Sequence, residues 1–300
     1  MTMKELFLVL TFISCISCTE RDKQGNALDT PTSGTISIAA DESMKPMVDA
    51  QVAAFEGIYQ YAHIDVHYTS ETRALQMLIH DSVRLAIIGR PLPEQEKQII
   101  TSQKIIPSEL KMATGGIALI TNNLAADSII TIDDLKNLLS GTPVREFSKI
   151  VFDQPGSGII KFLADTLRLD KGLAANCFAL AGSQAVVSYV AQQPGTLGLI
   201  DVCWISDRDD STANSFLDSI KVLAVAAQTE AFQPYQAYLA QRKYALSRDV
   251  FVISREARSG LGSGFTAFVA SDKGQRIVLK SGLVPATMPI RIIEINHQPF

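Results

Sequence analysis

Residues 151–163 read Val-Phe-Asp-Gln-Pro-Gly-Ser-Gly-Ile-Ile-Lys-Phe-Leu. The pattern predicts a buried strand, a tight Pro-Gly turn and the first turn of a helix. That first turn carries backbone N–H groups without helical partners, and Ser157 can add a hydroxyl at the cap. Because the helix dipole places partial positive charge at the same point, the segment has the features of a socket for a small anion. An ordinary capped turn between a strand and a helix is the alternative interpretation of this segment taken alone.

Strand and helix patterns alternate along the rest of the chain. Apolar spacing predicts strands at 35–40, 62–68 and 85–88 and helices at 45–55 and 73–81. Further strands are expected at 116–121, 150–152, 196–200, 221–225 and 248–254, and a last helix at 264–279. This alternation predicts an α/β fold with mostly parallel strands. The glycines at 260, 262 and 264 lack the spacing of a dinucleotide-binding fingerprint, and we expect a flexible loop there.

The first 18 residues have the pattern of an export signal. The apolar run at 6–13 is too short to span a bilayer, which needs about 20 residues, and it matches the core of a secretory signal. The run ends at Ser17-Cys18, which resembles the lipobox of bacterial lipoproteins, in which the cysteine receives lipid. Cys15 is the alternative lipid acceptor, and a cleaved signal without lipid is the other alternative. Residues 19–34 are polar and are expected to form a flexible tether.

Composition limits the remaining functions. The hydrophobic fraction of 47% is typical of a globular protein with a core, and the net charge of −4 argues against broad nucleic-acid binding. His63 and His67 lie in a strand pattern without zinc spacing, so we expect no metal site and no cofactor. Cys177 and Cys203 both lie among apolar residues, which allows either two buried free thiols or one disulfide.

The chain also resembles a known family over nearly its whole mature length. The matching segments are 36–46, 84–92, 113–122, 132–141, 187–200 and 265–285, in the order that this family has them. The most specific is 187–200, where a helix ends at Pro194-Gly195 and a strand follows. These segments resemble the phosphate-binding component of the bacterial phosphate ABC transporter, in its lipoprotein form.

The resemblance implies a two-lobed α/β fold of the type II periplasmic-binding-protein kind. Each lobe would contain a mostly parallel sheet flanked by helices, with the ligand in the cleft between the lobes. We place lobe 1 at 35–114 plus 245–291 and lobe 2 at 115–244. This agrees with the general rule that ligands of open α/β sheets bind beyond the carboxyl ends of the strands.

If the chain has the fold that this resemblance implies, four loops at strand ends supply the candidate ligand-binding residues. They are Glu42, Ser43 and Met44 after the first strand, Ser70 and Thr72 after the second, Gly89 and Arg90 after the third, and Gly156, Ser157 and Gly158 in lobe 2. Arg90 is expected to act as a bidentate clamp on the anion, with a plain salt bridge as the alternative. Glu71 is expected to act only on the helix dipole.

The sequence departs from the usual family pattern in three places. Gly89 stands where the family often has an Asp that accepts the proton of hydrogen phosphate, Asp153 lies in the region of a family Arg, and Ile159 replaces a Thr. The ligand is therefore expected to be phosphate held in a different way, or another tetrahedral oxyanion. Asp41, Glu42 and Asp153 are the candidates to replace the missing proton acceptor.

The expected function is that of an extracytoplasmic, lipid-anchored and monomeric solute-binding protein. It would capture inorganic phosphate or a related oxyanion and deliver it to the permease of an ABC importer. An anion sensor or surface binding protein with the same fold is the alternative. A hydrolase using Ser157 is disfavoured, because Pro155 breaks the Gly-x-Ser-x-Gly motif and only His297 follows in the expected order. We therefore expect no enzymatic activity.

Overall fold

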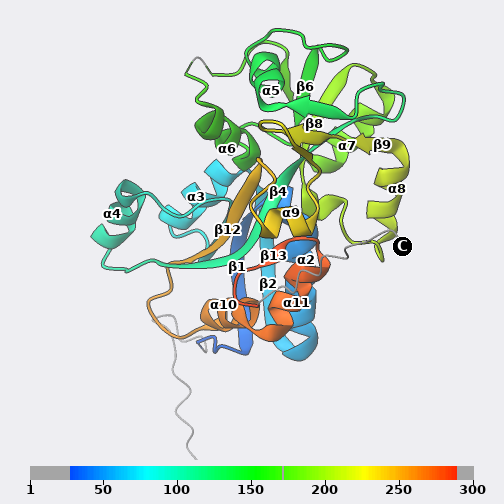
Figure 1. Ribbon diagram of the computed structural model, residues 1–300. Coiled ribbons are helices and arrows are strands. Elements are labelled where there is room, and N and C mark those ends of the chain that lie inside the picture. Colours follow the sequence, from blue (N-terminus) through cyan, green and yellow to red (C-terminus); the bar gives the residue numbers. More distant parts are fainter. Residues whose placement is uncertain (1–27, 171, 289–300) are drawn as a thin grey trace, which may run out of the picture.

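A computed structural model describes residues 28–170 and 172–288 of the chain. These residues form two α/β lobes, one above the other in Figure 1, which confirms the predicted two-lobed fold. The predicted signal and the candidate lipid acceptors Cys15 and Cys18 lie outside the described residues, as does His297. No helix within the described ranges has the length and apolar character needed to cross a membrane.

Lobe 1 is built on the sheet order β2-β1-β3-β12-β4. Strands β1 (Ser33–Asp41), β2 (Tyr61–Thr69) and β3 (Leu85–Ile88) are parallel, and β12 (Ser247–Ser254) runs antiparallel to β3 and β4. The helices of this lobe are α2 (Lys45–Ile58), α3 (Glu71–Ile79), α4 (Glu94–Ser102), α10 (Leu261–Ala270) and α11 (Asp272–Lys280). The short η1 (Glu42–Met44) joins β1 to α2, and β13 (Val284–Pro285) pairs with β4.

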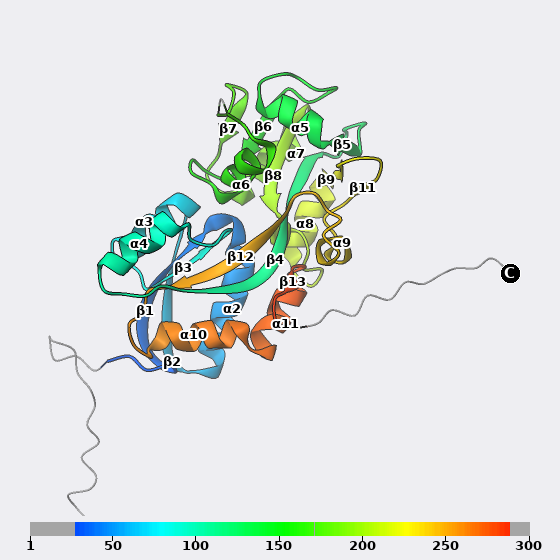
Figure 2. The same ribbon diagram turned by 60° about the vertical axis from the view of Figure 1, so that its left-hand side comes forward.

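Strand β4 (Ser108–Asn122) belongs to both lobes. Its first part pairs with β12, and its last part pairs with β8 (Thr196–Asp201) and β9 (Ile220–Val222). Figure 2 shows β4 crossing from one lobe into the other.

The sheet of lobe 2 continues from β8 through β6 (Lys149–Phe152) to β7 (Cys177–Ala179), and these three strands are parallel. Its helices are α5 (Ile132–Leu139), α6 (Gly158–Leu167), α7 (Ser183–Gln192), α8 (Ser211–Ser219) and the short α9 (Gln236–Ala240). A small sheet of β5 (Ile129–Thr131), β10 (Ala224–Ala226) and β11 (Ala231–Phe232) and the short η2 (Val202–Trp204) complete it.

Two of the predicted elements are each divided in the structure. The strand expected at 221–225 is divided into β9 and β10, because its backbone changes partner. Leu223 N donates to Leu119 O in β4, whereas Ala224 N donates to Ser128 O, just before β5. The helix expected at 264–279 becomes α10 and α11, and the Ser271 side chain caps α11 by accepting from Gly274 N. A change of backbone partner thus divides the strand, and the extended backbone of Ser271 divides the helix.

The flexible loop predicted around Gly260, Gly262 and Gly264 is wrong. Gly260 is the N-cap of α10, and the other two glycines lie inside that helix. A Cβ at Gly264 would overlap the backbone of Pro31, so this glycine allows the N-terminal segment to cross the helix. The glycine spacing therefore serves close packing of two backbones.

The N-terminal segment is fixed to lobe 1 at Asp29. The Asp29 carboxylate accepts hydrogen bonds from Arg84 Nη1 and Leu261 N, both at 2.6 Å, and it pairs with Arg258. The predicted boundaries of the tether and of the two lobes stay predictions.

The two cysteines of the described residues are free, with Cys203 buried and Cys177 half-buried, so the disulfide alternative is wrong. Within the described chain, no three His, Cys, Asp or Glu side chains are grouped so that they could hold a metal ion.

Candidate ligand site between the lobes

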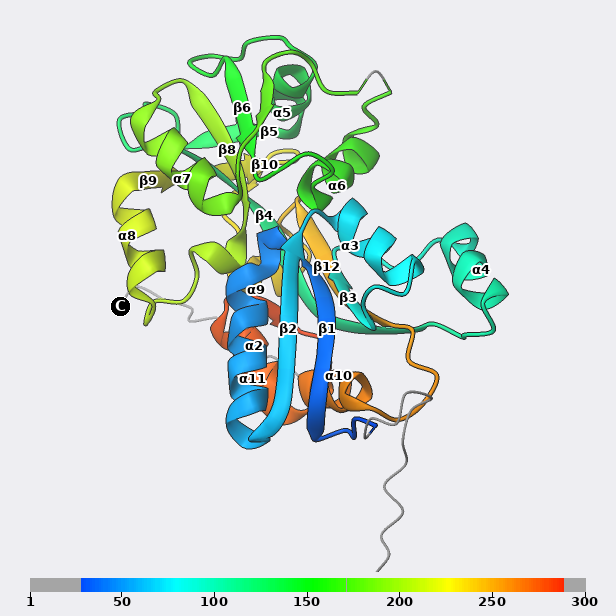
Figure 3. The same ribbon diagram turned by 180° about the vertical axis from the view of Figure 1, so that it is seen from behind.

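The carboxyl ends of β1, β2 and β3 in lobe 1 face the turn after β6 in lobe 2. Thr72 Oγ1 donates to Gly156 O at 3.2 Å, which joins the start of α3 to this turn. Figure 3 shows α3 and α6 next to each other at the boundary between the lobes. A Cβ at Gly156 would lie 3.2 Å from Ser70 Oγ. The structure therefore brings Ser70, Thr72 and Gly156 together.

Three serines predicted for the site are buried at this boundary. Ser43 is 0% exposed, Ser157 is 1% and Ser70 is 8%. The side chain of Ser157 caps α6 by accepting from Ile159 N at 3.2 Å, and Ser70 caps α3 by accepting from Arg73 N at 3.4 Å. The predicted strand, turn and capped helix at 151–163 are thus confirmed, while binding of an anion there stays a prediction.

Arg90 lies in a network of ion pairs within lobe 1. Its Nε donates to Glu71 Oε1 at 2.9 Å, and its two terminal nitrogens donate to Glu96 at 2.8 and 2.9 Å. An ion pair of Arg90 is therefore present in the structure, but it is partly buried and not the bare surface salt bridge of the alternative interpretation. The role of Arg90 as a clamp on a ligand stays a prediction.

Glu71 does more than interact with the helix dipole, and this expectation is wrong. Its carboxylate is buried and accepts from Gly89 N at 3.0 Å, in addition to its ion pair with Arg90. Glu71 thereby occupies the backbone donor of Gly89, one of the predicted ligand-binding groups. The reason is geometric, because α3 begins at the same edge of the sheet where β3 ends.

Glu42 reaches across to lobe 2. Its carboxylate accepts from Ser183 N at 3.1 Å and from Ser183 Oγ at 2.9 Å, at the first residue of α7. A side-chain carboxylate of lobe 1 thus lies where the positive end of a lobe 2 helix favours negative charge. The neighbouring Met44 is fully buried and packs in the hydrophobic core, and its role as a ligand-binding residue stays a prediction.

Arg248 is a site residue that sequence reasoning missed. It begins the predicted strand 248–254 and is fully buried, with Nη2 donating to Asp201 Oδ2 at 2.9 Å and to Ser43 Oγ at 2.8 Å. Its Nη1 has no hydrogen-bond partner among the described residues and faces Gly89, where a Cβ would lie 3.2 Å away. A charged residue at the start of an apolar strand was the available signal, since a buried arginine is almost always paired.

Asp41 and Asp153 add carboxyl groups from both lobes. Asp41 Oδ1 accepts from Ser43 N at 3.0 Å, but its Oδ2 and both oxygens of Asp153 have no well-aligned donor among the described residues. Burial raises the pKa of Asp41 to about 6, although the positive charge of Arg248 acts in the opposite direction. Burial and the negative charge of Asp41 raise the pKa of Asp153 to about 7. A hydrogen bond from the Ser157 hydroxyl acts in the opposite direction and lowers this pKa.

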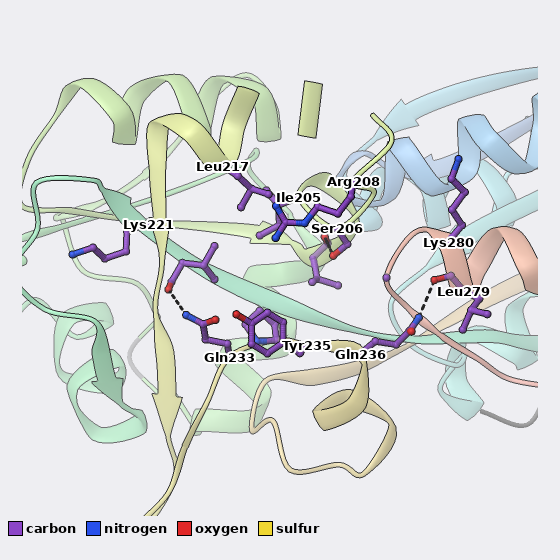
Figure 4. Close-up of a pocket in the computed structure, with 14 residues that line it drawn as sticks. Ile205, Ser206, Arg208, Leu217, Lys221, Gln233, Tyr235, Gln236, Leu279 and Lys280 are labelled. Carbon is purple, nitrogen blue, oxygen red and sulfur yellow. Dashed lines mark hydrogen bonds between the residues drawn. The ribbon is translucent and has the colours of Figure 1, made fainter. Parts of the chain in front are cut away.

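A cavity of about 480 Å³ lies elsewhere in the structure. It is lined by side chains of α8, β9, the segment before α9 and the end of α11, with Ile205, Leu217 and Tyr235 among them (Figure 4). None of the ten predicted ligand-binding residues lines it.

Comparison with known proteins places the fold in a family. A family model described as a PBP superfamily domain matches residues 25–273, which is most of the chain. The chain belongs to the PBP superfamily, the periplasmic-binding-protein fold. No curated protein matches it.

Solved structures share this fold at low sequence identity. A putative phosphate ABC transporter substrate-binding protein from Clostridium perfringens, with bound phosphate, matches with a TM-score of 0.70 and 20% identity over 84% of this chain and 100% of that chain. An ABC-type phosphate transport receptor from Vibrio cholerae matches with a TM-score of 0.63 and 16% identity, with the same coverage. The sulfate-bound regulatory domain of OxyR2 from Vibrio vulnificus matches with a TM-score of 0.52 and 12% identity, over 81% and 97% of the two chains. At these identities the likeness shows the fold alone.

Proposed function

We propose that this protein is an extracytoplasmic solute-binding lipoprotein that captures inorganic phosphate, or a related tetrahedral oxyanion, between its lobes. The observation that carries the proposal is the meeting of donors from both lobes at one buried place. Lobe 2 contributes the capped start of α6 at Ser157, and lobe 1 contributes Ser43, Ser70 and Arg248. Because the solved structure from Clostridium perfringens is a protein of this fold with bound phosphate, phosphate is the first ligand to test.

The donors fit the chemistry of an oxyanion. Ser43 Oγ accepts from Arg248, and the Ser43 hydroxyl also lowers the pKa of Asp41 by hydrogen bonding to it. A ligand oxygen beside Ser43 would take this hydroxyl proton in place of Asp41. Nη1 of Arg248 provides a charged donor without a protein partner. The N-terminus of α6 adds backbone N–H groups and a favourable dipole at Gly158. The resembled family has an arginine in the region where this chain has Asp153. In the proposed site Arg248 supplies that positive charge instead.

The unpartnered carboxyl groups fit a ligand that carries protons. Asp41 and Asp153 can accept hydrogen bonds from the hydroxyl groups of a protonated phosphate, whereas sulfate is fully ionised near neutral pH and has no proton to donate. A buried acceptor left without a donor costs about 1–3 kcal/mol. We therefore expect phosphate to be bound in preference to sulfate.

Isothermal titration calorimetry with phosphate and sulfate tests this proposal, and Ser43→Ala is the informative variant. Loss of one hydrogen bond to a charged ligand should weaken phosphate binding by about 1.5–3 kcal/mol, or roughly tenfold or more. Ser102→Ala is the matched control, because the exposed Ser102 hydroxyl donates only to Ile99 O on α4. Unchanged phosphate affinity in Ser43→Ala, or no heat with any oxyanion, would contradict the proposed site.

Attachment to the membrane through Cys18 is the second part of the proposal. It is supported by the export-signal pattern and by the small residue before this cysteine. Replacing Cys18 with Ala should move the protein from the membrane fraction to the soluble fraction, as followed by immunoblotting. Cys15→Ala is the matched control and should leave the protein in the membrane. Retention of the Cys18 variant and release of the Cys15 variant would assign the anchor to Cys15.

Delivery to an ABC permease is the third part, and it distinguishes an importer from an anion sensor. The OxyR2 regulatory domain has the same fold in a regulatory protein, so the fold is compatible with both roles. Permease and ATPase genes beside this one would support uptake. Loss of phosphate uptake by cells that lack the gene is the direct measurement. We propose no catalytic step for Ser157.

A further inference from the structure

Two buried carboxyl groups meet at the boundary between the lobes. Asp41 is the last residue of β1 in lobe 1, Asp153 follows β6 in lobe 2, and both are 0% exposed. The Asp41 carboxylate lies against the lobe 2 backbone, because a Cβ at Gly158 would overlap its Oδ2. Asp153 precedes the same turn that ends at Gly158, and Asp41 Oδ2 and both oxygens of Asp153 have no hydrogen-bond partner among the described residues. The negative charge of Asp41 is one of the causes that raise the pKa of Asp153.

Both surrounding guanidinium groups are paired with other carboxylates, although Nη1 of Arg248 has no hydrogen-bond partner among the described residues. Arg248 uses Nε and Nη2 for Asp201, and Arg90 is held by Glu71 and Glu96. The groups that act on Asp41 are Arg248, Glu71, the Ser43 N–H and hydroxyl, and Gly158. Those that act on Asp153 are Asp41, Glu42, Arg248 and the Ser157 hydroxyl. Carboxylates outnumber guanidinium groups here, so the closed boundary has a deficit of positive charge.

We propose that Asp41 and Asp153 hold one proton between them when the lobes are closed, so that closure takes up a proton from solvent. The proton neutralises one of the two like charges. Without it, two ionised carboxylates would be buried beside each other, which costs several kcal/mol for each ion even after the protein relaxes. When the lobes open, water solvates both groups and the proton returns to solvent.

The direction of the pH dependence follows from the two pKa values. In the closed structure burial raises the pKa of Asp41 to about 6 and that of Asp153 to about 7, both above the ordinary value of 3.8. Open lobes would return these groups to water and to ordinary values. The closed state is therefore favoured at low pH, and this advantage is lost as the pH rises through about 6 to 7.

This inference does not depend on which ligand the cleft binds. It rests on two carboxyl groups of the protein itself, and it predicts closure in the absence of any bound anion. A ligand that donates its own protons to Asp41 and Asp153 would replace the shared proton.

Small-angle scattering in a buffer free of phosphate and sulfate tests the proposal. The radius of gyration of the wild type should be smaller at pH 5.5 than at pH 8.5. Asp153→Asn and Asp41→Asn each replace one of the two carboxyl groups by a permanently neutral amide of nearly the same shape. Both variants should therefore show the small radius at both pH values. Asp165→Asn, which changes an exposed carboxyl on α6, should keep the wild-type pH dependence.

Superimposable wild-type profiles at the two pH values would overturn the proposal. So would a pH-dependent radius that persists in both Asn variants, and circular dichroism would verify that each variant is folded. If phosphate fails to bind while the radius still changes with pH, only the proposed ligand is wrong. If phosphate binds while the radius does not change with pH, only the shared proton is wrong.

Discussion

Replacement of Arg248 by Met should lower the free energy of unfolding by about 3–5 kcal/mol. Arg248 and Asp201 are both fully buried, and the guanidinium is the only ion-pair partner that the structure shows for the Asp201 side chain within the described residues. The variant would leave an ionised carboxylate in the interior, where an unpaired charge is strongly destabilising. Urea denaturation followed by circular dichroism measures the loss.

Two further variants control this prediction. Combining Arg248→Met with Asp201→Asn removes the unpaired charge and should recover a large part of the lost stability. Arg276→Met breaks an ion pair with Asp272 whose side chains are 72% and 64% exposed, and it should cost less than about 1 kcal/mol. A loss of under about 1 kcal/mol in Arg248→Met itself would mean that water or a second partner reaches Asp201.

The same substitution should also affect ligand binding. Because Arg248 Nη2 donates to Ser43 Oγ and its Nη1 has no protein partner, Arg248→Met removes the charged donor of the proposed anion site. The double variant with Asp201→Asn separates this effect from stability, since it should fold and yet fail to bind phosphate.

The parts of the fold that depend on neighbouring residues could be predicted from the sequence. The segment 151–163 forms the predicted strand, turn and helix because its apolar residues, its Pro-Gly pair and the cap at Ser157 act within a few positions of each other. Strand β3 has the predicted bounds, since its four apolar residues end at the turn that begins with Gly89.

The interactions that shape the site could not be predicted in this way. Ser43 and Arg248 are 205 positions apart, and Glu42 and Ser183 are 141 apart. Only the fold brings these side chains together, so neither local pattern nor spacing reveals them. The resemblance to the phosphate-binding family pointed to loops that meet at the boundary between the lobes. It could not show that Glu71 takes the donor of Gly89 or that Arg90 is already paired.

Replacement of Gly158 by Ala should keep the protein folded but prevent the lobes from closing. Gly158 is the first residue of α6 and does not have a positive φ, so the backbone itself accepts Ala without strain. In the closed structure, however, the new Cβ would overlap Asp41 Oδ2 and lie 2.7 Å from Glu71 Oε2. Asp41 is held by the Ser43 N–H and Glu71 by Gly89 and Arg90, so neither carboxylate can easily move aside.

Overpacking of this kind costs about 1–3 kcal/mol, and because it is confined to the closed state it should weaken anion binding roughly 5–150-fold. Scattering at saturating phosphate should give a larger radius of gyration for Gly158→Ala than for the wild type. Gly57→Ala is the matched control, since Gly57 lies in α2 with no atom within 4 Å of its added Cβ, and it should leave phosphate affinity unchanged. If Gly158→Ala bound phosphate as tightly as Gly57→Ala does, the ligand would not require the close approach of the lobes that this structure shows.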